Sequence, residues 1–177
     1  AVKGRNHEVV KELLKAVADD SKTRKAMLTQ RDQRSSNNAL MVAVGKSDHE
    51  MVQMLLKAVA DDSKTREAML TTQNNHQNNA LRIAVQKENL QIVEIFLTNF
   101  DKVFNAVDDR DTHKAIHFNM LNNALLFALE TNRVTPSIIK SAILQTLLDS
   151  FKRYPNNAKF AVNTFYGKVP LILINQN

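Results

Sequence analysis

The stretch from Leu13 to Arg24, LLKAVADDSKTR, occurs a second time, letter for letter, from Leu55 to Arg66. The likeness continues for one more turn, because Lys25-Ala-Met-Leu28 corresponds to Glu67-Ala-Met-Leu70. A repeat at a fixed period is typical of a solenoid, in which each unit packs on its neighbours instead of around one centre. The copy therefore predicts a stack of similar units, and it favours a scaffold or binding role over an enzyme.

The same repeat can be followed through the rest of the chain. A short alanine-led motif marks each unit, at Ala1, Ala43, Ala84 and, in a looser form, Ala128. The spacings are 43 − 1 = 42, 84 − 43 = 41 and 128 − 84 = 44 residues. We therefore expect a single helical repeat domain, 1–177, with units near 1–36, 37–77, 78–121 and 122–166 and a partial fifth unit at 167–177. Because the first residue lies inside a unit and is not Met, we expect a fragment of a longer protein.

Apolar residues within a unit follow a helical period. Val9, Val10, Leu13, Leu14 and Val17 form one stripe, at spacings of i, i+1, i+4, i+5 and i+8. A shorter segment with small residues precedes the later stripes and suits close helix packing. Only 3 Gly and 3 Pro occur, which disfavours a sheet protein with many tight turns. The chain is therefore expected to be all-α, with a short helix, a tight turn and a longer helix in each unit.

These residues resemble the ankyrin repeat, whose pattern is roughly T-P-L-H-x-A-A followed by G-H-x-E-I-V-x-x-L-L. Residues 38–44 stand for the first part, and residues 48–56 and 89–97 stand for the second. An Asn-Asn-Ala-Leu opening, at 37–40, 78–81 and 122–125, replaces the Thr-Pro of the family, and Asn is itself a good helix N-cap. The resemblance implies an ankyrin-like helical solenoid.

The period of about 42 residues exceeds the ~33 of an ordinary ankyrin repeat. The surplus follows the long helix, where an Asp or Ser precedes a segment ending in Ala-Met-Leu. We therefore predict a third short helix per unit, near residues 21–28, 63–70 and 101–107. HEAT and armadillo repeats have similar periods and are the structural alternative, although the Asn-Ala-Leu opening argues against them.

No residue pattern indicates catalysis, a metal or a cofactor. The Asp pairs at 19–20 and 61–62 occupy equivalent positions, so helix capping explains them better than acid–base catalysis. His113 and His117 have helical spacing, but Lys114 stands where a zinc protease needs Glu. The chain has 0 Cys, and its 3 Gly are too scattered for a phosphate loop. We expect a protein that is not an enzyme.

The resemblance implies that partners bind the concave face, which combines loop tips with the exposed side of the short helices. The matching positions are Lys3, Met41, Lys46, Arg82, Gln86, Lys87, Glu130 and Thr131, with Arg34 and His76 near the loop tips. Lys3, Lys46, Arg82 and Lys87 would form a basic stripe, and the formal net charge is +6. We therefore expect a protein partner with an acidic surface.

Two other functions stay open. The basic stripe would also suit nucleic acid, although aromatic residues make up only 6% and no RNP-like or zinc-finger pattern occurs. The other alternative is that the chain is the targeting domain of an enzyme whose catalytic part lies outside it. Lengthened units rich in Asn and Lys also resemble the ankyrin arrays of effectors that intracellular bacteria deliver into host cells. That resemblance implies action in the cytoplasm, or in the host cytosol, and no apolar run approaches the ~20 residues of a membrane span.

Overall fold

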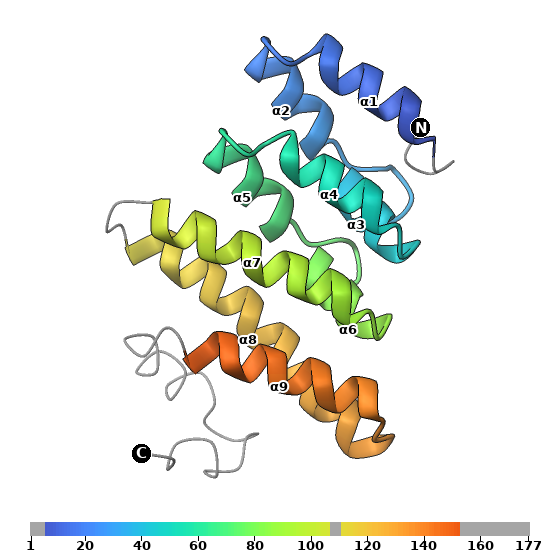
Figure 1. The fold of residues 1–177 in the computed structure, drawn as a ribbon, viewed down its shortest axis with the longest axis vertical. Coiled ribbons are helices and arrows are strands. Elements are labelled where there is room, and N and C mark those ends of the chain that lie inside the picture. The colour runs from blue at the N-terminus through green and yellow to red at the C-terminus, as the bar shows by residue number, and fades with distance from the viewer. Residues whose placement is uncertain (1–5, 107–110, 153–177) are drawn as a thin grey trace.

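The computed structural model describes residues 6–106 and 111–152. Within those ranges the chain is helical and contains no strand. The helices are α1 (His7–Ala16), α2 (Ser21–Thr29), α3 (Ala39–Gly45), α4 (His49–Lys57), α5 (Ser63–Thr71), α6 (Ala80–Gln86), α7 (Leu90–Ala106), α8 (Asp111–Val134) and α9 (Ile138–Lys152). Figure 1 shows them stacked in chain order, with α1 and α2 at one end and α8 and α9 at the other.

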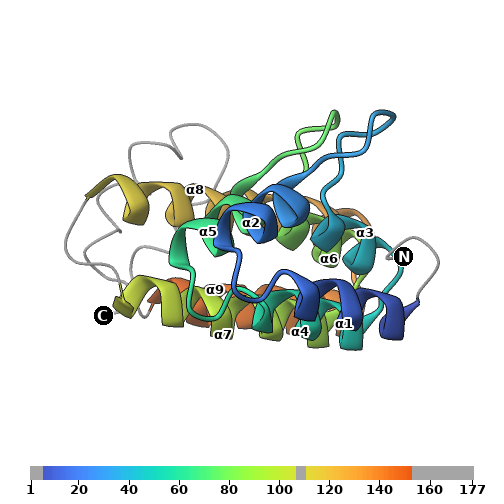
Figure 2. The same cartoon turned by 90° about the horizontal axis from the view of Figure 1, so that it is seen from above.

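The helices form two layers, which are separated clearly in Figure 2. The outer layer contains α1, α4, α7 and α9, and each of these helices packs on the next. The inner layer contains α2, α3, α5, α6 and α8, with α2 beside α5, α3 beside α6 and α6 beside α8. One continuous apolar core lies between the layers and runs through the whole stack. The predicted all-α solenoid is confirmed.

The extra helices α2 and α5 begin at the duplicated Asp-Asp-Ser-Lys-Thr-Arg motif. The Asp20 carboxylate accepts hydrogen bonds from the Thr23 backbone N–H (2.9 Å) and hydroxyl (2.6 Å). Asp62 and Thr65 repeat the same cap on α5, at 2.9 and 2.6 Å. Two orphan N–H groups at the helix starts are thereby satisfied. The short helices predicted near 21–28 and 63–70 are confirmed, and the Asp pairs serve as caps.

An arginine in each copy closes the turn before the short helix. Arg24 donates to the carbonyl of Ala18 at 2.9 Å, and Arg66 donates to the carbonyl of Ala60 in the same way. Arg24 also lies 3.6 Å from the carboxylate of Asp61 in the following unit. Both copies therefore carry the same turn and cap contacts, and the first copy adds an ion pair to the next unit.

The capping carboxylates have depressed pKa values in the folded chain. Hydrogen bonds from the Thr23 hydroxyl and then its backbone N–H lower the pKa of Asp20. Burial raises the pKa of Asp62, but the hydrogen bonds from Thr65 and the charge of Arg24 outweigh burial, so its pKa is lowered overall. A lowered pKa means that the folded state prefers the ionised carboxylate more than the unfolded state does.

Stability is consequently expected to fall in acid. The contribution of Asp20 and Asp62 is fully present above their unfolded pKa of about 4, and it is lost as the pH falls through the lower folded values. Urea unfolding between pH 6 and pH 2 measures this dependence. An Asp62→Asn variant keeps the capping oxygen but does not titrate, so its stability should fall less steeply. An equal slope in both proteins would contradict the assignment.

The third short helix predicted at 101–107 is wrong over the described residues 101–106. There α7 continues without a break, and Thr98 and Asn99 donate side-chain hydrogen bonds to the carbonyls four residues earlier, as in an uninterrupted helix. Residue 107 lies outside the described ranges. The reason is local, because Asp101 has Phe104 three residues later where Asp20 has Thr23. The Asp–Thr cap that starts α2 and α5 therefore has no counterpart in the third unit.

The Asn-Ala-Leu opening starts a helix in two of its three occurrences. Asn38 caps α3 and Asn79 caps α6, each accepting from a backbone N–H three residues on at 2.9 and 2.8 Å. Both follow a residue in the left-handed region, Ser36 (φ 57°) or Gln77 (φ 58°), which turns the chain. The corresponding Asn123 instead lies inside α8, as does its buried neighbour Asn122. The helix start expected there is wrong, because apolar residues precede Asn122 and the helix continues through them.

The tight turns between the inner and outer helices also use left-handed residues. Ser47 and Glu88 hold φ values of 53° at equivalent positions. A side chain in this region costs about 1–2 kcal/mol relative to the right-handed region. Ser47→Gly is therefore expected to raise the free energy of unfolding by up to about 1 kcal/mol, after the entropy of glycine is subtracted. Ser47→Val should lower it, and denaturant titration of the three proteins gives the order; a Val variant as stable as the Gly variant would contradict it.

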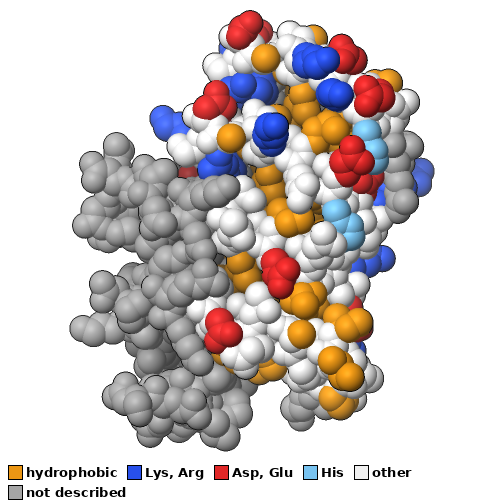
Figure 3. Space-filling view, viewed as in Figure 1, with side chains coloured by type: hydrophobic (Ala, Val, Ile, Leu, Met, Phe, Trp, Pro, Cys, Tyr) orange, Lys and Arg blue, Asp and Glu red, His pale blue; other side chains and the backbone are white. Residues whose placement is uncertain are grey.

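Two histidines join the outer helices of neighbouring units. His7 donates from Nε2 to the Asp48 carboxylate at 3.0 Å, and His49 Nε2 lies 3.0 Å from Asn89 Oδ1. Asp48 and Asn89 are themselves the caps of α4 and α7, so each bond ties one unit to the start of the next outer helix. In Figure 3, His side chains (pale blue) lie one above the other on the face shown. These two histidines therefore act as contacts between units.

Candidate partner-binding face

Two loops project from the inner layer and lie side by side in Figure 2. We call them finger 1 (residues 30–38) and finger 2 (residues 72–79). The Asn75 backbone N–H donates to the Ser35 carbonyl at 3.1 Å, and Arg31 donates to the Gln73 carbonyl at 2.6 Å. A side-chain bond of 2.9 Å between an Asn of each finger adds to these. The fingers therefore form one cross-linked unit and are not two independent loops.

The predicted loop-tip residues Arg34 and His76 are exposed on these fingers. They come from different units but lie together, because Asn75 donates both to Ser35 and to the Arg34 carbonyl (3.3 Å). Their positions are those that the sequence indicated. A role for them in binding stays a prediction.

The ends of the inner helices carry most of the other predicted residues. Four of them are exposed: Lys46 at the end of α3, Gln86 and Lys87 at the end of α6, and Glu130 in α8. Thr131 in α8 is half-buried. Lys3 lies outside the described residues. The helices thus bring polar side chains from three units to one edge of the inner layer.

The expectation that Met41 contacts a partner is wrong. Its side chain is 1% exposed and belongs to the core, because α3 is enclosed by α2, α4 and α6. The next residue, Val42, is half-buried instead, and so are Ile83 and Phe127 on α6 and α8. Sequence reasoning missed this apolar row. The repeat spacing could have revealed it, since 83 − 42 = 41 and 127 − 83 = 44.

Arg82 bridges two inner helices and does not extend into solvent. Its guanidinium carbon lies 4.9 Å from the centre of the Phe127 ring, a cation–π contact between α6 and α8. Its Nε is buried and makes no hydrogen bond within the described part of the chain. Of the four residues expected in the basic stripe, two described ones are therefore exposed, Lys46 and Lys87.

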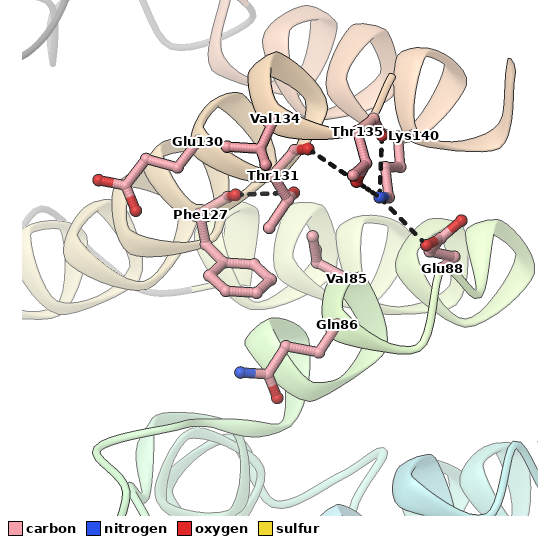
Figure 4. A pocket seen from close by; sticks show the side chains of 9 residues that line it. All are labelled: Val85, Gln86, Glu88, Phe127, Glu130, Thr131, Val134, Thr135 and Lys140. Carbon is pink, nitrogen blue, oxygen red and sulfur yellow. Dashed lines mark hydrogen bonds and ion pairs between the residues drawn. The ribbon is translucent and has the colours of Figure 1, made fainter. Parts of the chain in front are cut away.

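A groove of about 340 Å³ lies between α6 and α8 (Figure 4). Lys140 of α9 closes one end of the groove. It donates to the Thr135 carbonyl at 3.0 Å and pairs with the Glu88 carboxylate at 3.5 Å. The lining residues are Val85, Gln86, Glu88, Phe127, Glu130, Thr131, Val134, Thr135 and Lys140. Three predicted residues, Gln86, Glu130 and Thr131, therefore meet in one concave feature.

Over the ranges that the structure describes, no three His, Asp or Glu side chains are grouped so that they could hold a metal ion. The side chains of His113 and His117 lie outside the described set, although their backbone belongs to α8. None of the described helices has the length and apolar character required to cross a bilayer.

Comparison with known proteins gives one match. A family model of ankyrin repeats, in three copies, matches residues 1–108. The matched region includes α1 to α7, both fingers and the α6 side of the groove. No curated protein and no solved structure matches the chain.

Proposed function

Because the chain belongs to the ankyrin-repeat family, whose repeats are generally protein–protein interaction modules, we propose that it is a scaffold that binds a partner protein through its inner layer and fingers. The observation that supports this proposal most strongly is the cross-linking of the fingers. Their tips, Arg34 and His76, are held together by bonds between units that are about 41 residues apart in the sequence.

The proposed mechanism is rigid display. A stack with a continuous core holds its surface side chains in place before the partner arrives, so little conformational entropy is lost on binding. The inner face offers an apolar row, Val42, Ile83 and Phe127, bordered by polar helix ends. An apolar centre with a polar rim is the usual composition of a protein interface.

The exposed lysines support a partner with an acidic surface. Lys46 and Lys87 occupy equivalent positions at the ends of α3 and α6, since 87 − 46 = 41. Charges on the rim of an interface act mainly on the association rate and on specificity. The lengthened units rich in Asn and Lys support a further proposal, that the partner belongs to a host cell and is met in its cytosol.

Nucleic-acid binding is a weaker proposal for this face. Arg82 was expected to belong to the basic stripe. Its guanidinium instead lies over the Phe127 ring. Phosphate recognition by the remaining exposed lysines would show a steep loss of affinity with salt. The proposal that the chain targets an enzyme is compatible with the scaffold, because the activity would then lie in another part of the protein.

A double substitution tests the scaffold proposal. Lys46→Glu with Lys87→Glu should weaken capture of the partner from cell lysate by at least about tenfold, since two attractive contacts become repulsive. The matched control is Lys11→Glu with Lys57→Glu, which changes the net charge equally at exposed positions of the outer helices α1 and α4. Binding that disappears after nuclease treatment would support nucleic acid instead. Equal loss in both double variants would contradict the choice of face.

A further inference from the structure

The groove between α6 and α8 exists because the C-terminal end of α8 extends one turn further than the ends of its counterparts α3 and α6. Gly45 is the last residue of α3, and Gln86 is the last residue of α6. The equivalent position in α8 is Glu130, which lies inside the helix. Helix α8 continues to Val134, and 134 − 130 = 4 residues is about one turn. This extra turn extends past the end of α6 and forms one wall of the groove (Figure 4). The junction of α6 and α8 therefore differs from that of α3 and α6.

The groove has an apolar floor and an apolar lip. Val85 and the Phe127 ring line it, and Val134 is 72% exposed at its edge. Small-molecule pockets usually measure about 300–1,000 Å³ and enclose most of their ligand. This groove is at the low end of that range and open to solvent, so it suits one or two side chains of a larger partner. An exposed apolar lip beside it favours an aliphatic side chain.

The charges around the groove do not balance. Lys140 is already paired with Glu88, and Gln86 is neutral. Glu130 is exposed on the rim, and no cation of the described residues pairs with it. Arg82 stacks on Phe127 and makes no ion pair with Glu130. Among the described residues that line the groove, the unpaired charge is therefore negative, and it complements a Lys or Arg of the occupant.

Residues four apart on a helix lie about 6 Å apart on the same face. Glu130 and Val134 are so related, and both line the groove. In an extended peptide, residues i and i+2 share one face and are separated by a similar length, at about 3.3 Å per residue. An aliphatic residue against Val134 and a basic residue at Glu130 are therefore expected two positions apart.

We propose that the groove between α6 and α8 binds an extended segment of the partner protein that carries an aliphatic residue and, two positions away, a Lys or Arg paired with Glu130. The proposal rests on the proposed scaffold function and specifies the peptide chemistry at one part of the same face. Lys46 and Lys87 contact other, acidic residues of that partner.

The test uses a random dodecapeptide display library, selected on the full chain. Enriched peptides should carry the aliphatic-x-basic pattern, and a peptide made from the enriched sequence should lose at least about tenfold in affinity for Val134→Arg, because the lip is then blocked. The matched control is Ile138→Arg, which alters a side chain that is 90% exposed but does not line the groove. Equal losses in the two variants, or no pattern among the peptides, would overturn the proposal.

A charge exchange tests the pairing with Glu130. Glu130→Lys should weaken the peptide about two- to fivefold, as expected for an exposed ion pair, and a peptide with Glu in place of its basic residue should recover the loss. Glu94→Lys, on the exposed side of α7, is the control. No recovery would overturn the pairing. If Lys46→Glu with Lys87→Glu abolishes binding but Val134→Arg does not, the proposed groove site is overturned. The scaffold function would then stand. Binding that neither variant changes would overturn both.

Discussion

Leu55→Ala is expected to lower the free energy of unfolding by about 2–5 kcal/mol, whereas Leu13→Ala should lower it by less than about 1 kcal/mol. The two leucines occupy the same position of the identical LLKAVADDSKTR copies. Leu55 is 1% exposed because α4 packs between α1 and α7, and Leu13 is 46% exposed on α1. Local sequence is therefore constant, and only the neighbouring helices differ.

Urea denaturation of the two variants and the parent protein measures the difference. Helix propensity changes by the same amount in both, so it cancels when the two losses are subtracted. What remains reports the burial supplied by the preceding unit, which is the quantity that holds a solenoid together. Equal losses would contradict the packing, because they would mean that stability is set within a unit and not between units.

Asn38→Ala is expected to cost about 2–4 kcal/mol, clearly more than the ~1 kcal/mol of an ordinary cap. The fully buried Asn38 side chain serves two helices at once. Its Oδ1 caps α3 by accepting from Met41 N–H at 2.9 Å, and its Nδ2 donates at 2.8 Å to the carbonyl of Met69 in the last turn of α5. Removing it leaves buried donor and acceptor groups without partners.

Asn79→Ala is the matched control for that prediction. Asn79 caps α6 in the same manner and is also buried, but within the described residues it makes no bond that corresponds to the one with Met69. Asn38→Asp separates the two roles of Asn38, since it keeps the capping oxygen and places a carboxylate against a carbonyl. We expect Asn38→Asp to be as damaging as Asn38→Ala at pH 7. A loss near that of Asn79→Ala for both Asn38 variants would contradict the second role.

The general architecture could be predicted from the sequence because the same pattern of apolar and capping residues recurs from unit to unit. The helical spacing of apolar residues predicted the helices, and the duplicated Asp caps predicted α2 and α5. The third unit could not be read by analogy. Asp101 and Asn123 match the capping residues of the earlier units. The Thr that completes the Asp cap and the left-handed residue that precedes the Asn cap are missing there. A cap depends on its partners, and a single matching residue does not predict it.

The candidate site was predictable in position and less so in detail. Counting along the repeat located the helix ends, and Lys46, Gln86, Lys87 and Glu130 are exposed there. It failed at Met41, because a seven-residue helix that contacts three others leaves few positions free, and spacing alone does not say which. The groove could not be predicted from the sequence, since it arises from one additional turn at the end of α8 and from a contact with α9.

The identical copies also make the length of the stack adjustable. A chain from which residues 13–54 were excised would join Glu12 to Leu55 and still contain one intact LLKAVADDSKTR, because 55 − 13 = 42 residues is one whole period. His7 would then stand where His49 stands, 49 − 7 = 42 positions away, opposite Asn89, the cap of α7. No new junction has to be invented at either side of the cut. A unit can in this sense be removed or added as a whole. The stack then becomes shorter or longer, and the sequence that joins neighbouring units stays the same.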